Sequence, residues 1–231
     1  MLQKKIEKTL GIKVKNIKLF EMALTHRSAV NEYKGVCEHN ERLEFLGDAV
    51  LELVVTEYLY KKYPDLSEGV LTNLRSSLVK GDTLSQMAKE LSFGKMLKLS
   101  KGEELFGGRE KSSLLANTVE ALIGAIYLDS GLKNVKVLIE KNLIPKLKNI
   151  IKKGSYVDSK SQFQQIAQSK LKKTPYYKSI SEIGPDHDKI FEVRVFVGEK
   201  SYGQGKGSSK QEAQQNAAKN ALDNLEHKNE K

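Results

Sequence analysis

The stretch HNERLEFLGDAVLELVV, residues 39–55, determines the fold that we expect for most of the chain. Placed on a helix at about 100° per residue, it is apolar around most of its circumference, which predicts burial. The one remaining direction holds four carboxylates, from Glu41, Glu44, Asp48 and Glu52. A helix that looks built for burial therefore carries a narrow acidic stripe.

The acidic stripe lacks an obvious source of compensating charge. Glu44 and Asp48 lie one helical turn apart, where like charges repel, and apolar surroundings make each harder to ionise. Arg42 points to another side of the helix, and residues 39–60 contain no lysine. A divalent cation would resolve this conflict, and carboxylate oxygens suit Mg²⁺, with Mn²⁺ as a possible substitute. The alternative is that the stripe simply faces solvent, as on an ordinary amphipathic helix.

A second segment repeats this arrangement. In SLLANTVEALIGAIYL, residues 113–128, apolar side chains occupy most directions, while Asn117 and Glu120 share the remaining side with Gly124. Two such helices could face each other and enclose a metal site. The predicted ligands are Glu44, Asp48, Asn117 and Glu120.

Composition limits the classes of protein that remain. The chain has 231 residues, of which 39% are hydrophobic and 29% charged, enough for one ordinary domain and a small one. Its net charge of +10 favours an anionic partner such as nucleic acid, although a basic protein without such a partner would look similar. Cys37 is the only cysteine, which excludes an intramolecular disulfide and a cysteine-based zinc site. No apolar run approaches 18 residues, so we expect a cytoplasmic protein without a membrane segment.

Periodicity divides the chain into two domains. Residues 1–151 show apolar side chains at helical spacing, so we expect an all-α domain there. Residues 152–158 are polar and contain a glycine, as expected of a linker. Residues 159–226 predict a helix, three strands and a helix, a small α+β domain of order α-β-β-β-α, followed by a tail at 227–231.

The run NERLEFLGDAVL, residues 40–51, resembles the signature of bacterial ribonuclease III, an endonuclease that cuts double-stranded RNA. The resemblance extends through ALTHRS (23–28), LRSSLV (74–79), GGREK (107–111) and LANTVEALIGAIYLDSG (115–131). The C-terminal part, with GPDH at 184–187 and GSSKQEAQQNAA at 207–218, resembles a double-stranded-RNA-binding domain.

The resemblance implies an all-α endonuclease domain that homodimerises and a flexibly attached RNA-binding domain. It also implies Mg²⁺-dependent hydrolysis that leaves 5′-phosphate and 3′-hydroxyl ends, without a small-molecule cofactor. Processing of ribosomal RNA precursors, and of messenger and transfer RNAs, would be the corresponding cellular roles.

The resemblance also implies roles for single residues. Glu44 and Asp48 match two acids of the family's active site, and Glu120 matches a glutamate that binds metal directly, so Asp48 and Glu120 are the expected catalytic residues. Glu41 matches an acid of the site or of the substrate contacts. Phe45 matches an aromatic that packs across the dimer interface, although the sequence equally allows an ordinary core aromatic.

Two basic residues, Arg109 and Lys111, fall in the loop before the second helix and are expected to steer substrate.

Asn117 departs from the family pattern, which has Asp at this position. Its amide oxygen can still coordinate a hard cation, but it brings no negative charge, so weaker metal affinity is expected. The three remaining acids favour retained activity. The competing interpretations are a non-catalytic double-stranded-RNA-binding protein on the same fold and an assembly or ribosome-associated structural protein.

The small domain offers several candidate RNA contacts, and A-form RNA is recognised through its minor groove and phosphates. GQGKGSSK, residues 203–210, is interpreted as a strand end that runs into a helix start, with Ser208 or Ser209 as N-cap. Free backbone N–H groups there would bind phosphate. The alternative for Gln165 and Gln168 is an ordinary solvated helix face. A single loop histidine such as His187 often has no special role. The candidate contacts are Gln165, Gln168, His187, Ser209 and Lys210.

Overall fold

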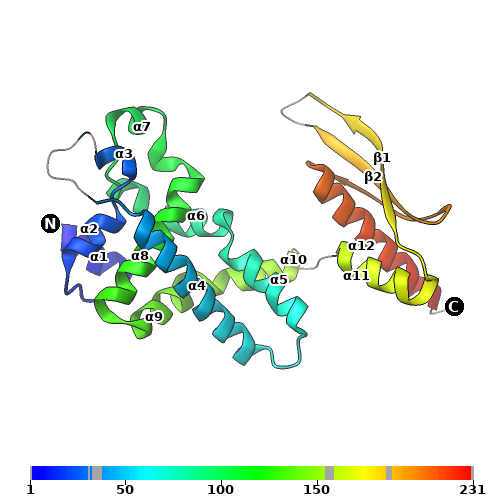
Figure 1. Ribbon diagram of the computed structural model, residues 1–231, viewed down its shortest axis with the longest axis horizontal. Helices are drawn as coiled ribbons and strands as arrows, with labels where there is room; N and C mark the ends of the chain where they lie inside the picture. Colours follow the sequence, from blue (N-terminus) through cyan, green and yellow to red (C-terminus); the bar gives the residue numbers. More distant parts are fainter. Residues whose placement is uncertain (1, 31, 33–37, 154–158, 186–188, 230–231) are drawn as a thin grey trace. The chain divides into compact units, whose positions relative to one another are not determined.

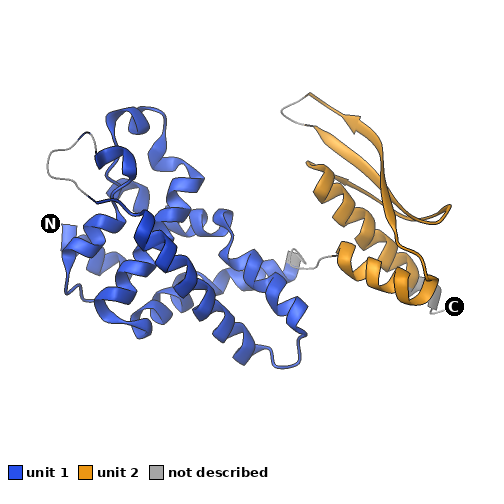
Figure 2. Ribbon diagram, in the orientation of Figure 1, with its two compact units in different colours: residues 1–156 blue, residues 157–231 orange. Residues whose placement is uncertain are grey.

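The computed structural model of the protein describes residues 2–30, 32, 38–153, 159–185 and 189–229 (Figure 1). Cys37, His187 and most of the predicted linker at 152–158 therefore lie outside the described residues. The chain forms two compact units, Met1–Tyr156 and Val157–Lys231 (Figure 2). Among the described residues, no helix combines the length and the apolar character needed to cross a lipid bilayer.

The first unit is helical, as expected, with short 3₁₀ turns at Phe93–Met96, Gly108–Glu110 and Ile144–Lys146. An isolated parallel bridge joins Thr25 to Lys98. The α-helices are α1 (Leu2–Leu10), α2 (Ile17–Ala23), α3 (Arg27–Val30), α4 (Glu41–Lys62), α5 (Glu68–Val79), α6 (Gly81–Glu90), α7 (Lys101–Leu105), α8 (Ser112–Ser130), α9 (Leu132–Asn142) and α10 (Leu147–Lys153).

Helix α8 lies at the centre of this unit, and nearly all of its side chains from Leu115 to Ile126 are buried. It packs against α2, α4, α6 and α9. A helix that is apolar all round needs neighbours on every side, which explains this central position.

Two glycines allow α4 and α8 to approach unusually closely. A Cβ atom added to Gly47 would collide with the backbone carbonyl of Glu120, and one added to Gly124 would collide with the carbonyl of Leu43. The two backbones are therefore in direct contact at this crossing, where any larger residue would force the helices apart.

One side of α4 differs from the sequence prediction. Phe45 is 82% exposed and Leu53 is 57% exposed, so the helix is not buried around most of its circumference. The interpretation of Phe45 as an ordinary core aromatic is therefore wrong. Helical periodicity records which side chains are apolar but not which of them the same chain covers.

The second unit has the predicted α-β-β-β-α order, and its antiparallel sheet has the order β1-β2-β3. Its core combines Phe163, alternate valines of the central strand and four alanines of the last helix. The elements are α11 (Ser159–Ile166), a π-helical turn η4 (Ala167–Leu171), β1 (Tyr176–Ile183), β2 (Ile190–Val197), β3 (Lys200–Gly207) and α12 (Lys210–Asn229).

Every second residue at the end of β3 is a glycine that faces α12. Cβ atoms added to Gly203, Gly205 or Gly207 would collide with the backbone of α12 near Ala213 and Ala217. The alanine-rich helix thus lies directly on the strand. This geometry confirms that residues 203–210 are a strand end leading into a helix.

Candidate active site

The crossing of α4 and α8 gathers four polar side chains that the sequence singled out. Glu44 and Asp48 come from α4, while Asn117 and Glu120 come from α8. The side-chain amide of Asn117 donates a hydrogen bond to the Glu44 carboxylate. Glu44 and Asp48 are both close enough to Glu120 to influence its pKa. The four side chains therefore form one polar group, in which Asp48 is exposed and the others are half-buried.

The electrostatics of this group are unfavourable for three separate negative charges. Burial, together with the neighbouring carboxylates of Asp48 and Glu44, raises the pKa of Glu120 to about 7. Burial also raises the pKa of Glu44, with a contribution from Glu41 and Asp48, while the hydrogen bond from Asn117 opposes the rise. A group with these properties gains from a positive ligand.

The donor set fits a hard divalent cation, because it offers three carboxylates with coupled ionisation and one amide oxygen. Within the described part of the chain, no three His, Cys, Asp or Glu side chains are already arranged as a metal site. The assignment of Glu44, Asp48, Asn117 and Glu120 as ligands therefore stays a prediction.

Glu41 lies at the outer end of the acidic stripe and has basic neighbours that the sequence analysis missed. Its carboxylate is 3.5 Å from the Arg27 guanidinium and 3.8 Å from Nδ1 of His39. The expectation that this stripe has no basic residue beside it is therefore wrong for Glu41. Arg27 lies in the short helix α3, and no local spacing rule could have placed it there.

The two basic residues before α8 differ in their surroundings. The Arg109 guanidinium donates to the carbonyl oxygens of Gly94 (2.9 Å) and Leu97 (2.8 Å) and pairs with Glu104 at 2.7 Å. These contacts favour a role in holding the loop over a role in steering substrate. Lys111 is exposed, and its ammonium is 3.5 Å from Glu103.

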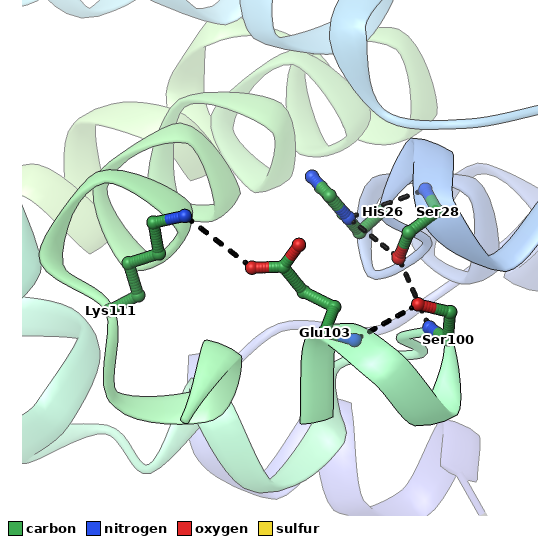
Figure 3. Close-up of polar contacts among 5 residues, drawn as sticks. All are labelled: His26, Ser28, Ser100, Glu103 and Lys111. Carbon is green, nitrogen blue, oxygen red and sulfur yellow. Dashed lines mark hydrogen bonds and ion pairs between the residues drawn. The ribbon is translucent and has the colours of Figure 1, made fainter. Parts of the chain in front are cut away.

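A polar network beside this loop was not predicted by the sequence analysis. It links His26, Ser28, Ser100, Glu103 and Lys111 (Figure 3). The ALTHRS motif could have pointed to this network, because it contains His26 and Ser28. The sequence analysis used the motif only for the resemblance and gave its histidine no chemical role.

A cavity of about 830 Å³ opens beside the exposed face of α4. Phe45 and Leu46 line it together with His39, and Leu128 of α8 completes its apolar part. Phe45 and Leu128, which line the cavity, are each more than half exposed, so part of its rim is apolar and open to solvent, while Glu41 and Arg42 line another part.

The predicted RNA contacts of the second unit are only partly free. Gln165 and Gln168 are exposed. Ser209 is the N-cap of α12, since its hydroxyl accepts from the backbone N–H of Glu212 at 3.2 Å. Lys210 is not an isolated cation, because its ammonium pairs with Glu182 at 2.7 Å.

Comparison with known proteins adds independent information. Residues 16–147 match a family described as Ribonuclease-III-like, and residues 159–225 match the Double-stranded RNA binding motif. A protein of Bdellovibrio bacteriovorus named Ribonuclease 3 is 44% identical over 222 residues, which are 96% of this chain and 95% of that protein. A Ribonuclease 3 of Natranaerobius thermophilus is 47% identical, with 95% of each chain covered. The nuclease domain of ribonuclease III from Campylobacter jejuni is 44% identical, with a TM-score of 0.55, and covers 61% of this chain and 97% of its own.

Proposed function

Because this chain belongs to the ribonuclease III family of endoribonucleases that act on double-stranded RNA, we propose that its activity depends on Mg²⁺ held between α4 and α8. The proposed ligands are Glu44, Asp48, Asn117 and Glu120. The observation that carries the proposal is the cluster of half-buried Glu44 and Glu120 with exposed Asp48, at a crossing where the two backbones touch.

When bound, the metal would supply a water ionised at neutral pH and stabilise the charge on the leaving oxygen. The residues of the chain divide the remaining tasks. Asn117 orients Glu44 through its donated hydrogen bond. Glu120 has a pKa of about 7 in the metal-free protein, so it would release its proton when it binds the metal near neutral pH. The proposed products are 5′-phosphate and 3′-hydroxyl ends, and the proposed role is the processing of ribosomal RNA precursors and other structured transcripts.

The second unit would hold the duplex by shape. Gln165 in α11 and Gln168 in the π-helical turn that follows are both exposed, and such long neutral side chains suit 2′-hydroxyls and base edges of the minor groove. The start of α12, with Ser209 and Lys210, would meet phosphate. His187 completes the proposed contacts on the strength of the resemblance alone.

We also propose that two copies associate through the exposed face of α4. Phe45 projects beside a cavity of about 830 Å³ that it shares with Leu46 and Leu128. A twofold interface uses the same patch on both copies, so a projecting aromatic next to a cavity is self-complementary in principle. Light scattering at micromolar concentration should give a dimer, and Phe45→Glu should give a monomer. A monomeric wild type would contradict this proposal.

Cleavage of labelled duplex RNA tests the catalytic proposal. Wild type should cut with Mg²⁺ or Mn²⁺ and not with chelator, whereas Glu44→Gln, Asp48→Asn and Glu120→Gln should bind RNA without cutting it. Glu52→Gln is the matched control, because Glu52 is exposed on the same helix outside the polar group. Cutting in chelator, or loss of RNA binding in step with cutting, would overturn the proposal.

The replacement of the family's usual aspartate by Asn117 suggests a second candidate function, that of a non-catalytic RNA-binding protein. That candidate predicts tight binding of duplex RNA and no cutting at any concentration of Mg²⁺ or Mn²⁺.

A further inference from the structure

His26, the residue before α3, is held in one tautomer. The backbone N–H of Ser28 donates to its Nδ1 atom at 3.3 Å, and the Ser28 hydroxyl lies 2.9 Å from the same atom. Because Nδ1 accepts from the backbone N–H, the ring proton lies on Nε2 and the hydroxyl also donates to Nδ1. The ring is thereby fixed in orientation as well as in protonation.

The contacts continue from His26 to the loop before α8 (Figure 3). The backbone N–H of Ser100 donates to the Ser28 hydroxyl at 3.0 Å. The hydroxyl of Ser100 in turn accepts from the backbone N–H of Glu103 at 3.1 Å. Glu103 then pairs with the ammonium of Lys111 at 3.5 Å. Figure 3 shows the Glu103 carboxylate lying between Lys111 and the His26 ring.

The loop that carries these residues is fixed at several points. The start of the loop is joined to the chain before α3 by two backbone hydrogen bonds. The N–H of His26 donates to the carbonyl oxygen of Lys98 at 3.0 Å, and the N–H of Lys98 donates to the carbonyl oxygen of Leu24 at 2.8 Å. Its turn is tight, because a Cβ atom on Gly108 would lie 2.7 Å from the carbonyl oxygen of Glu103. Lys111, the residue before α8, is therefore presented by a rigid support.

The network also reaches the beginning of α4. Four charged side chains lie close enough to His26 to influence its pKa, namely Glu103, Arg27, Glu41 and Lys111. Glu41 precedes the site acid Glu44 by one helical turn. Within the described part of the chain, Lys111 pairs with Glu103 and not with any of the proposed metal ligands.

We propose that Glu103 is a positioning residue that holds the Lys111 ammonium where it meets a backbone phosphate of the bound RNA, and that His26, through Ser28 and Ser100, holds the backbone of Glu103 in place. This inference rests on the proposed function, since it assumes that duplex RNA lies across the site. An exposed ion pair restrains a lysine only weakly by itself, so the restraint depends on the backbone of Glu103, whose N–H donates to the Ser100 hydroxyl.

The alternative role for Glu103 is to neutralise the charge of Lys111 and so to weaken its attraction for phosphate. Measuring the affinity for duplex RNA in the presence of chelator distinguishes positioning from neutralisation. Lys111→Met should weaken binding about fivefold and reduce the slope of log Kd against log salt by about 0.9, the effect of one lost phosphate contact. Glu103→Gln should weaken binding about two- to fivefold, and Glu103→Gln combined with Lys111→Met should bind no more weakly than Lys111→Met alone. A neutralising Glu103 would instead give tighter binding by Glu103→Gln, which overturns the proposal, as does an unchanged salt slope in Lys111→Met.

His26 is tested by two substitutions. His26→Asn keeps an acceptor for the Ser28 hydroxyl and should bind RNA within about twofold of wild type, whereas His26→Ala should match Glu103→Gln. Equal effects of both variants would contradict the proposed link from His26 to Lys111.

The matched control is the pair of Glu90 and Lys146, another ion pair of the first unit, with a distance of 2.7 Å. Glu90→Gln should leave affinity and salt slope unchanged, and an effect equal to that of Glu103→Gln would overturn the proposal. Because these measurements use chelator, they do not depend on cutting. A protein that fails to cut but shows the expected slopes would refute the catalytic proposal and retain this one.

Discussion

Glu120→Gln should stabilise the metal-free protein at alkaline pH, although it removes a proposed catalytic group. The pKa of Glu120 is raised from 4.5 to about 7, because the folded protein makes its ionised form unfavourable. In the unfolded chain this carboxylate ionises at its ordinary pKa. Between these two pH values the folded state binds more protons, so the free energy of unfolding falls as pH rises through this window. Glutamine has no ionisation, and the variant escapes this loss.

The size of the effect follows from the shift. One pKa unit corresponds to about 1.4 kcal/mol, so the shift of Glu120 would correspond to about 3 kcal/mol for a fully buried group. Glu120 is only half-buried, and solvent screening reduces this value to about 1–2 kcal/mol. For a unit of this size the expected rise in melting temperature is about 2–8 °C.

Thermal unfolding in chelator at several pH values from 5 to 8.5 measures this prediction. The difference in melting temperature between Glu120→Gln and wild type should grow with pH, because other titrating groups contribute equally to both proteins. It should level off above about pH 7, because Glu120 is then ionised in both the folded and the unfolded state. Glu52→Gln, which removes a charge from an exposed part of α4, should leave the melting temperature nearly unchanged. Added Mg²⁺ should stabilise wild type and not Glu120→Gln. A difference that is constant with pH would refute the reasoning.

Three further substitutions test the close approaches and the departure from the family pattern. Gly47→Ala should destabilise the first unit by about 3 kcal/mol in denaturant unfolding, because the helices must separate. Gly69→Ala is the control and should be neutral or stabilising, because its added methyl group meets no atom within 4 Å. Similar losses of stability in both variants would contradict this reasoning. Asn117→Asp should bind Mn²⁺ about five- to tenfold more tightly by calorimetry, since it adds a charge and removes the donor to Glu44; unchanged affinity would argue against Asn117 as a ligand. Gly205→Ala should abolish duplex binding while the first unit keeps its melting temperature, and retained binding would contradict the packing argument.

The helical unit, the three-stranded unit and the family itself could be predicted from the sequence, because periodicity and motif are local signals. The pairing of the two polar stripes was also anticipated, since each apolar helix had only one polar direction. What the sequence could not give was the identity of partners distant along the chain. Arg27 beside Glu41 and Glu182 beside Lys210 are contacts of this kind. The sequence could not predict that Phe45 is exposed, for a related reason. An apolar residue contributes to helical periodicity in the same way whether its own chain or a second copy covers its side chain.

The sequence places Gly124 on the polar side of its helix, but it does not explain why a glycine is needed there or at Gly47. Gly47 and Gly124 each lie against a backbone carbonyl of the other helix, so the positions of Glu44 and Glu120 depend on main-chain contact. Backbone contacts between buried helices are rigid, so the two acids have little freedom to separate. Lys111 depends on a different support, because its partner Glu103 lies in the turn that the Ser100 hydroxyl holds. Both kinds of support suit the proposed chemistry, because ligands of a hard cation require fixed geometry and a lysine that is already positioned loses less freedom when it meets a phosphate.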